Sequence, residues 1–391
     1  MLKAKWVALL LLVVIAVGIA GCGQAKTEKP AEKPAAPPAP EVIKIGVQGP
    51  ISGQWAFEGE GFVRAVTLLA EQLNAKGGVL GKKIEIIQGD DKSDPKESAL
   101  VAQKMVAEKV VAVIGSYASS LTEPASAIYD EAGILHVTPS STATKLTTKG
   151  YKRFFRTCFL DDRQALFAAE YMVSKGYKNA AIIHDNTTFA KGLAEWTQKY
   201  AEEKGIKTVF FDAVTPGEKD FTPTLTKVKA ANPDVIYYTG YFPEGGLIVK
   251  QAKDLKITAA LMGGNAVNNP EFVKIAGLKA AEGFVATTEP LPDDLPYPEA
   301  KQLIADYKAK YGTNVSTWAP FAADAFRVIV EAITKTNSTD PAKLAEYLHT
   351  KLKDFPGVTG PIIGFDEKGD RLGTVHKAYV VNEKGDFVLP K

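Results

Sequence analysis

Two clusters of hydroxyl side chains follow two successive apolar segments, 110–114 and 134–137. Their members are Ser116, Ser119, Ser120 and Thr122 in the first cluster and Thr138, Ser140, Ser141 and Thr142 in the second. Hydroxyls, backbone N–H groups and helix N-termini together bind small anions. Neither cluster contains Lys or Arg, which usually accompany a phosphate. A carboxylate therefore fits this chemistry better.

Helix capping is the competing explanation, because Ser and Thr are common residues at helix N-termini. For either cluster taken alone, capping is the more economical interpretation. The two segments follow consecutive strand-like runs, however, and neighbouring parallel strands would place the clusters side by side. Ligands of open α/β sheets bind beyond the carboxyl ends of the strands. The pair of clusters therefore predicts an anion-binding site.

Aromatic side chains lie at several other positions that follow apolar runs. Single aromatic residues usually belong to a core, but at strand ends in two lobes they can line a cleft for an apolar group. The residues concerned are Trp55, Phe57, Tyr117, Phe189, Tyr241 and Phe242, and Trp318 is expected to join them.

No catalytic arrangement is recognisable. The segment Gly59-Glu60-Gly61 lacks the final glycine of a dinucleotide fingerprint, and neither a Gly-x-Ser-x-Gly elbow nor a P-loop occurs. The four histidines are scattered without metal-ligand spacing. We expect a protein that is not an enzyme and that uses no cofactor and no metal.

The N-terminal segment has the pattern of a bacterial secretion signal, residues 1–22. Lys3 and Lys5 precede an apolar stretch, 7–17, which is short for a membrane span. The sequence Ile-Ala-Gly-Cys that follows resembles the lipobox of bacterial lipoproteins, which implies that Cys22 is lipidated. Residues 23–41 are rich in Pro, Ala, Lys and Glu and are expected to form a solvated tether.

Composition bounds the remaining possibilities. With 391 residues, 46% of them hydrophobic, the chain can form a sizeable core and more than one lobe. A net charge of +2 argues against nucleic acid as a partner. Cys158 is the only cysteine besides Cys22, so no internal disulfide is expected, and we interpret it as a buried apolar residue.

From residue 42 onward, strand-like runs alternate with helical patterns. Strands are expected at 42–48, 83–88, 110–114, 134–137, 179–184, 208–213, 235–239, 260–262, 379–382 and 387–389. Helices are expected at 59–75, 95–109, 122–132, 163–175, 193–204, 223–230, 244–254, 299–311 and 321–335. The alternation predicts parallel sheets covered by helices on both faces, arranged as two doubly wound lobes.

Several segments together resemble the leucine/isoleucine/valine-binding proteins of bacterial ABC importers. They include "VQGPISG", "DDKSDP", "IGSYASSLTEPASAIYDEAGIL", "TPSSTATKLT", "YYTGYFPE" and "GPIIGFDEKGD". The resemblance implies an α/β, type I periplasmic binding protein fold: two Rossmann-like lobes joined by a three-crossover hinge that close on a ligand. The expected lobes are 42–160 with 290–368 (N-lobe) and 161–289 with 369–391 (C-lobe).

The same resemblance implies a binding site for the carboxylate of an amino acid. Ser119, Ser140 and Thr142 match the family's carboxylate site, with Ser141 between them. Tyr117 and Ala118 match positions near the ligand side chain. From the second lobe, Phe189 matches a family tyrosine, whose hydroxyl it lacks, and Tyr241 matches another. Trp55 and Trp318 complete the expected site.

Asn265 departs from the family pattern, because it matches the acidic residue that binds the α-ammonium group. An asparagine can accept a hydrogen bond from an ammonium but contributes no charge. Glu58 is a candidate for the missing negative charge. Alternatively, the ligand lacks an α-ammonium and is an amide, a urea-like compound or a carboxylic acid.

These features predict an extracytoplasmic receptor that is anchored by lipid on Cys22 and captures a branched-chain or other apolar amino acid. The expected partners are an ABC permease and its ATPase, and the receptor is expected to be a monomer. A sensory ligand-binding module is a second possibility. A secreted α/β enzyme is a third, for which no catalytic constellation is found.

Overall fold

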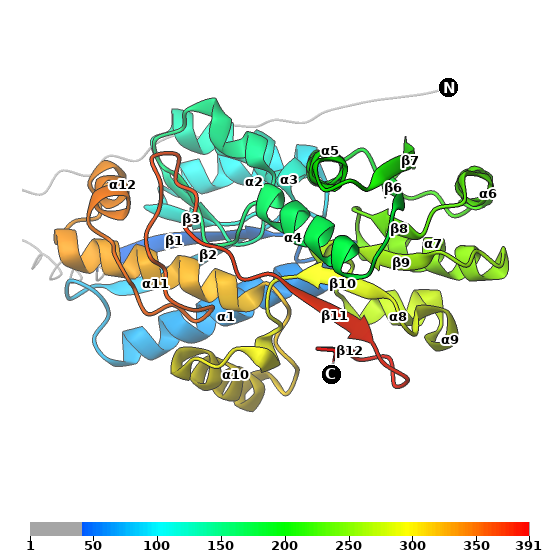
Figure 1. The fold of residues 1–391 in the computed structure, drawn as a ribbon. Coiled ribbons are helices and arrows are strands. Elements are labelled where there is room, and N and C mark those ends of the chain that lie inside the picture. The colour runs from blue at the N-terminus through cyan, green and yellow to red at the C-terminus, as the bar shows by residue number, and fades with distance from the viewer. Residues whose placement is uncertain (1–40, 391) are drawn as a thin grey trace, which may run out of the picture. The chain divides into compact units, whose positions relative to one another are not determined.

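Two β-sheets organise residues 41–390, the part of the chain that this computed structural model describes (Figure 1). The first sheet is parallel and has the strand order β2-β1-β3-β4-β5. Its strands are β1 (Val42–Gly49), β2 (Lys83–Asp90), β3 (Ala112–Ile114), β4 (Leu135–Thr138) and β5 (Phe154–Arg156). We call this sheet and the helices packed on it the N-lobe.

The second sheet, which defines the C-lobe, has the order β12-β11-β10-β9-β8-β6-β7. Five strands are parallel: β6 (Asn179–His184), β7 (Lys207–Ala213), β8 (Val235–Tyr238), β9 (Ala260–Gly263) and β10 (Val285–Thr288). The last two strands are β11 (Lys377–Val381), which pairs antiparallel with β10, and β12 (Phe387–Val388), which pairs antiparallel with β11 at the edge of the sheet, unlike the parallel pairs of the other five strands. They differ because β11 enters from the other lobe and β12 follows it through a tight turn at Asn382, with no βαβ crossover.

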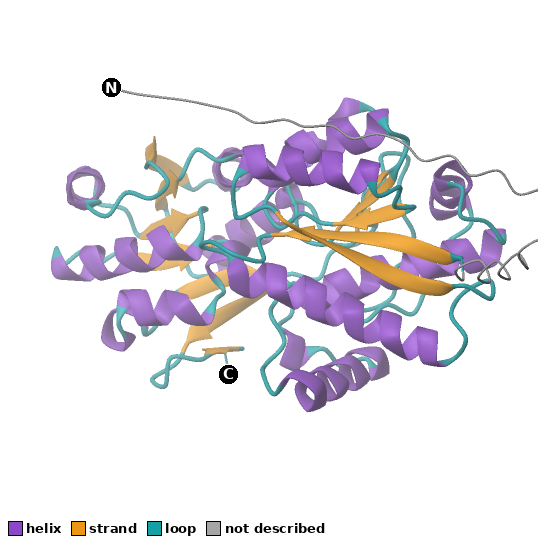
Figure 2. Cartoon of the chain, turned by 180° about the vertical axis from the view of Figure 1, so that it is seen from behind, coloured by secondary structure: helices purple, strands orange, loops and turns teal. Residues whose placement is uncertain are grey.

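Helices cover both lobes (Figure 2). Those of the N-lobe are α1 (Ala56–Ala75), α2 (Pro95–Ala107), α3 (Ser119–Glu131), α10 (Pro298–Tyr311), α11 (Ala319–Thr336) and α12 (Pro341–Thr350). Those of the C-lobe are α4 (Asp161–Ser174), α5 (Thr188–Glu203), α6 (Thr222–Ala231), α7 (Phe242–Asp254), α8 (Pro270–Ala276) and α9 (Leu278–Ala281). Short 3-10 turns are η1 (Thr144–Lys149), η2 (Asn265–Val267) and η3 (Pro292–Asp294).

The core lies between each sheet and its helices. All four residues of β8 are buried, as expected for a parallel strand that is covered on both faces. In the N-lobe, Ile43, Ile45 and Val47 of β1 are buried as well. Strand β10 was not recognised in the sequence because its "VATT" lacks the long apolar side chains that mark the other strands.

Helix starts show how local sequence builds these elements. The side chain of Asp94 accepts hydrogen bonds from the backbone N–H groups of Lys96 and Glu97 at 2.8 and 3.1 Å, with Pro95 at the first helical position. This confirms the predicted start of α2. Helix α3, by contrast, begins at Ser119, three residues before the predicted start at Thr122. Ser119 therefore lies in the first turn, where backbone N–H groups have no partner within the helix.

The chain passes between the two sheets three times. It leaves β5 for α4, leaves β10 for α10 through η3, and returns from α12 to β11. The lobe boundaries expected from the sequence remain a proposal. Gly369 O accepts from Arg156 N at 3.0 Å, and Arg371 donates to Thr157 O at 2.8 Å. We therefore favour moving the last boundary from 368 to Gly373.

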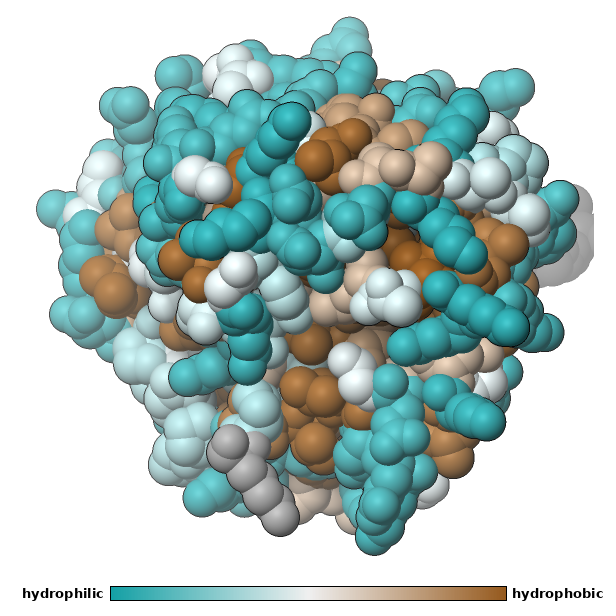
Figure 3. All heavy atoms as spheres, turned by 45° about the vertical axis from the view of Figure 1, so that its right-hand side comes forward, coloured by the Kyte–Doolittle hydropathy of each residue, from teal (hydrophilic) through white to brown (hydrophobic). Residues whose placement is uncertain are grey.

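Residues 1–40, and with them the proposed signal, Cys22 and most of the tether, lie outside the described part of the chain. Between residues 41 and 390 we find no helix with the length and apolar character needed to cross a bilayer. On the face shown in Figure 3, polar side chains cover most of the surface and apolar side chains form separate patches.

Candidate functional site

The two hydroxyl clusters lie against each other, because β3 and β4 are neighbouring parallel strands. The hydroxyl oxygens of Thr122 and Ser141 are 2.6 Å apart. The backbone N–H of Ala143 donates to Ser119 Oγ at 3.2 Å, which joins the start of α3 to the second cluster. The predicted adjacency of the clusters is therefore confirmed, whereas their role in binding a ligand stays a prediction.

Some of these hydroxyls stabilise the loops themselves. Ser140 Oγ donates to Tyr117 O at 2.9 Å, and Ser141 Oγ donates to Ser116 O at 3.1 Å. Ser141 is fully buried and does not line the cavity described below. Ser119 and Thr142 do line it, so these two hydroxyls and the nearby backbone N–H groups are the donors available to an anion.

A buried guanidinium donates hydrogen bonds to backbone carbonyl groups in and next to the second hydroxyl cluster. Arg156, which is fully buried, donates from Nη1 to the carbonyl oxygens of Ser141 and Ala143 at 2.7 and 3.2 Å. Its Nε lies 2.6 Å from Asp370 Oδ1. Charged donors bonded to these carbonyls polarise the peptide groups of the loop, so its N–H groups become better donors to an anion.

A small cavity lies where the two lobes meet. It is lined by Tyr117, Ser119, Ser140, Thr142, Phe189, Tyr241, Asn265, Ala266 and Trp318. All of these except Ala266 were predicted from the sequence. Its volume is about 10 Å³, roughly the space of one water molecule. Because sites for small molecules usually span about 300–1,000 Å³, an amino acid can enter only if the lobes or the aromatic side chains move apart.

Aromatic rings from both lobes close this cavity. The rings of Trp55 and Tyr241 have centroids 4.4 Å apart, and Tyr117 lies 5.7 Å from Trp55. Phe189 lies 5.5 Å from Tyr241. Trp55 is buried and packs on two lining residues without lining the cavity itself. These rings form an apolar wall next to the hydroxyl clusters, because Tyr117 belongs to the loop of the first cluster.

The other predicted residues lie around this wall. Ala118 is buried in the loop before α3, and Phe242 is buried at the start of α7. Phe57 is 39% exposed and lines a different, surface pocket. None of these three residues lines the cavity.

Asn265 is held by an acidic residue that sequence reasoning missed. Asn265 Nδ2 donates to Glu289 Oε2 at 3.2 Å, and both side chains are buried. Glu289 directly follows β10, at the point where the chain leaves the second sheet. Since β10 itself was not predicted, the acidic residue at its carboxyl end was not flagged as a candidate.

Two more buried carboxyl groups lie close to the cleft. Burial raises the pKa of Glu58 to about 7, against hydrogen bonds from Ser316 and from the backbone N–H of Trp318 that favour the charged form. Burial likewise raises the pKa of Asp161, at the start of α4, to about 7. Glu58 does not line the cavity, and its proposed role as a counter-charge stays a prediction.

The rim of the cleft contains hydrogen bonds between the lobes. Thr188 Oγ1 in the C-lobe donates to Glu123 Oε2 in the N-lobe at 3.0 Å. Trp196 Nε1 donates to Thr144 Oγ1 at 3.2 Å. These bonds exist only while the lobes are close, so they stabilise the closed arrangement.

Cys158 is fully buried, as predicted, and burial raises the pKa of its thiol far above the usual range. Within residues 41–390, His, Cys, Asp and Glu side chains form no group suited to holding a metal ion.

Two doubly wound lobes, three crossovers and a site between the lobes define a solute-binding protein of the type I periplasmic class. The family model described as "Periplasmic binding protein" matches residues 42–386, and the chain belongs to this family. The fold and the relatives are those of substrate-binding proteins, not of enzymes.

Individual relatives agree with this assignment. A leucine-, isoleucine-, valine-, threonine- and alanine-binding protein of Pseudomonas aeruginosa is 40% identical over 336 residues, covering 85% of this chain and 88% of the relative. The Leu/Ile/Val-binding protein of Escherichia coli is 37% identical, covering 85% and 89% of the two chains.

Solved structures show the same likeness. A leucine-binding protein from Thermotoga maritima superposes with a TM-score of 0.82 at 31% identity, covering 89% of this chain and 99% of that one. A branched-chain amino acid binding protein from Streptococcus pneumoniae, solved with isoleucine, gives a TM-score of 0.80 at 30% identity and covers 89% and 98%.

Proposed function

We propose that this protein is the receptor of an ABC importer and captures a branched-chain or other apolar α-amino acid between its lobes. The named ligands of its relatives support this proposal, because they are leucine, isoleucine, valine and similar amino acids. The protein carries out no chemistry on the ligand, and its function depends on binding and closure.

One observation carries the proposal: the two ends of the cleft have opposite polarity. The loop of Ser140 to Thr142 offers hydroxyls and N–H groups, with the Arg156 guanidinium behind it. On the opposite lobe, Asn265 lines the cavity with the Glu289 carboxylate behind it. An α-amino acid has the complementary arrangement, a carboxylate and an ammonium on one carbon.

The remaining surface suits an apolar side chain. In the proposed complex, Ser119 and Thr142 donate to the ligand carboxylate, and the rings of Tyr117, Phe189 and Tyr241 enclose the side chain. Closure removes water from both, which strengthens the hydrogen bonds and buries apolar area. A ligand that binds both lobes shifts the population toward the closed form, which we propose is the form that the permease recognises.

Asn265 also favours a second candidate ligand class. With an amide in place of a carboxylate at the cavity surface, an amide, a urea-like compound or a carboxylic acid without an α-ammonium would meet a neutral hydrogen-bonding partner there. These compounds belong in the same ligand screen.

A thermal-shift screen against amino acids, amides and organic acids tests the ligand class, because a ligand that binds only the folded state raises the melting temperature. We expect the largest shift with leucine, isoleucine or valine. A shift with amides or organic acids alone would transfer the assignment to the second class.

We propose that the receptor works outside the cytoplasm, held at the membrane by lipid on Cys22 and a tether over residues 23–41. The cysteine after Ile-Ala-Gly supports this placement. Cell fractionation tests it: the unchanged protein should sediment with membranes, and Cys22→Ala should move it to the soluble fraction. Membrane retention of the variant would contradict lipid anchoring.

A further inference from the structure

Glu289 is a buried carboxylate that lies one residue behind the cavity surface. It is fully buried, and Oε2 accepts hydrogen bonds from Asn265 Nδ2 at 3.2 Å and from Thr288 Oγ1 at 3.4 Å. Oε1 has no hydrogen-bond partner among the described residues. A buried carboxylate with so few donors costs folding free energy, so its presence needs an explanation.

We propose that Glu289, acting through the amide of Asn265, is the counter-charge that binds the α-ammonium group of the ligand. This inference rests on the proposed function and adds that the ligand must carry an ammonium group. It replaces Glu58 as the source of the negative charge.

The orientation of Asn265 follows from the chemistry of its partner. An ionised carboxylate only accepts hydrogen bonds, so the amide must turn its Nδ2 toward Glu289. The amide oxygen is then directed away from Glu289, and Asn265 lines the cavity. The carboxylate therefore positions an acceptor, Oδ1, at the surface where an ammonium would bind, and its charge increases the negative potential there.

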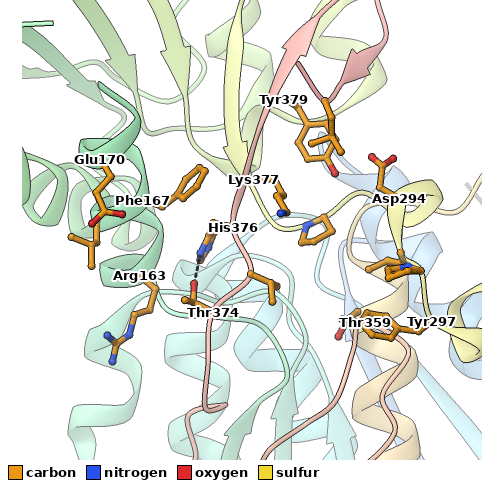
Figure 4. A pocket seen from close by; sticks show the side chains of 16 residues that line it. Arg163, Phe167, Glu170, Asp294, Tyr297, Thr359, Thr374, His376, Lys377 and Tyr379 are labelled. Carbon is orange, nitrogen blue, oxygen red and sulfur yellow. Dashed lines mark hydrogen bonds between the residues drawn. The ribbon is translucent and has the colours of Figure 1, made fainter. Parts of the chain in front are cut away.

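His376 lies on the other side of Glu289. Its Nε2 is 3.6 Å from Glu289 Oε1. Its Nδ1 is 2.8 Å from Thr374 Oγ1, as the dashed line in Figure 4 shows. His376 and Thr374 line a pocket of about 720 Å³ between α4 and the second and third crossovers. A continuous row of polar side chains therefore extends from the cleft to the hinge: Asn265, Glu289, His376 and Thr374.

The charges around Glu289 make it available to a ligand. No lysine or arginine of the described chain forms an ion pair with it, and His376 is the one basic side chain of the described residues within 4 Å of it. Glu58, by contrast, acts on Tyr117, whose pKa is raised mainly by burial and further by the charge of Glu58. The Glu58 carboxyl accepts a hydrogen bond from Trp318 N at 3.4 Å and none from Asn265. Asp161, at the start of α4, lies beside the hydroxyl loop instead, because its backbone N–H donates to Thr142 O at 3.1 Å.

A purely structural role for Glu289, joining β10 to the third crossover through His376, is the competing explanation. The two roles differ in ligand specificity. A counter-charge affects only ligands that carry an ammonium, whereas a structural role affects every ligand and the stability of the protein alike.

Calorimetric titration with leucine and with 4-methylpentanoate, which is leucine without its ammonium group, separates the two roles. For Glu289→Gln we expect about 10- to 100-fold weaker leucine binding, as loss of one partly screened charge pair predicts. Affinity for 4-methylpentanoate should stay within about twofold. Glu244→Gln is the matched control: Glu244 is a buried carboxylate of α7 that accepts from Gly217 N at 2.8 Å, and both affinities should be unchanged.

Relocating the charge gives an independent test. The double variant Asn265→Asp with Glu289→Gln puts the carboxylate at the cavity surface and should restore leucine affinity to within about fivefold of the original protein. If 4-methylpentanoate binds too weakly to measure, leucine binding by this double variant decides between the two roles by itself. Restored binding also shows that the cleft still folds without the Glu289 carboxylate.

Three results would overturn the inference. Unchanged leucine affinity in Glu289→Gln shows that the carboxylate does not act on the ligand. Equal weakening of both ligands without rescue by Asn265→Asp assigns Glu289 a structural role. Selective loss in Glu58→Gln instead returns the counter-charge to Glu58. If the unchanged protein binds no α-amino acid at all, the proposed function fails first, and this inference fails with it.

Discussion

Trp55 of the N-lobe packs against Tyr241 of the C-lobe in a tilted arrangement, with ring centroids 4.4 Å apart and planes inclined by 34°. Each residue directly precedes a helix, α1 and α7 respectively. Helices that start at the carboxyl ends of facing sheets thus bring two aromatic rings together across the cleft. The contact closes the apolar side of the site, and it must rearrange when a ligand enters.

We expect this contact to make Trp55 a determinant of ligand affinity. Trp55→Ala removes the ring that packs on Tyr241 and Tyr117, and we expect leucine binding to weaken about tenfold or more. Trp55→Phe keeps an aromatic ring and should lose less than about fivefold. Phe57→Ala is the control, since that exposed ring lies outside the cavity. Calorimetric titration measures all three, and full affinity in Trp55→Ala would show that the ring does not act on the ligand.

The carboxylate site is tested with Ser119 and Thr142. Replacing both with alanine removes two hydroxyl donors, and hydrogen bonds to charged groups are each worth about 1.5–3 kcal/mol. We expect the thermal shift caused by leucine to disappear. Ser120→Ala, a change at the adjacent position that does not line the cavity, should keep it. A normal shift in the double variant would mean that the carboxylate binds elsewhere.

Closure is tested at the rim. Thr188→Val removes the hydrogen bond to Glu123 between the lobes, and we expect leucine to bind about two- to fivefold more weakly, mainly through faster dissociation. Thr226→Val removes a threonine hydroxyl that bonds only within α6, and it should leave the dissociation rate unchanged. Stopped-flow release of leucine measures the rate. Equal rates in the two variants would exclude a role for this contact in closure.

The pH dependence of stability follows from Glu58. Its pKa is about 7 in the folded protein, above the ordinary value of 4.5, so the folded state holds this proton where the unfolded state has lost it. As the pH rises from 4.5 to about 7, the folded protein loses stability relative to the unfolded chain, by at most about 3 kcal/mol.

Glu58→Gln removes this titration. We expect the variant to be more stable than the original protein at about pH 8, with a smaller difference or none at about pH 5. Urea denaturation at the two pH values measures the effect. A constant difference between variant and original protein would show that Glu58 does not titrate in this window.

The ion pair of Arg156, which lies behind the loop of Ser140 to Thr142, with Asp370 can also be tested by substitution. Arg156→Met leaves the Asp370 carboxylate buried without its partner, and we expect a loss of about 3–5 kcal/mol in the free energy of unfolding. Adding Asp370→Leu should recover part of that loss, because no uncompensated charge remains. Thermal unfolding of the single and double variants measures it, and a further loss in the double variant would contradict this account.

Local patterns in the sequence predicted most of the fold. Asp94 and Pro95 marked the start of α2, and the run 179–184 marked β6 to the residue, because these signals act over a few neighbouring positions. The two-lobed arrangement and the hinge of three crossovers were expected from the resemblance to known receptors. Elements without strong local signals were missed, such as β10 with its two threonines and the short strand β5.

The sequence predicted individual residues of the candidate site but not all of the contacts between them. Hydroxyls after consecutive strands indicated a shared anion site, since parallel strands end at the same edge of a sheet. The partner of Asn265 was not predictable in this way, because Glu289 lies 24 positions further along the chain and His376 lies at the end of the last crossover. No periodicity connects such distant residues.

By itself, the sequence determined which segments form strands and helices, and which small, polar and aromatic side chains stand at the strand ends. Hydrophobic period and capping residues act locally, so they can be recognised in the chain alone. Only the tertiary structure decided which of those side chains meet: Trp55 with Tyr241, Ser119 with the loop of Thr142, and Asn265 with Glu289. Those contacts depend on how two lobes are joined and closed, which is a property of the whole chain.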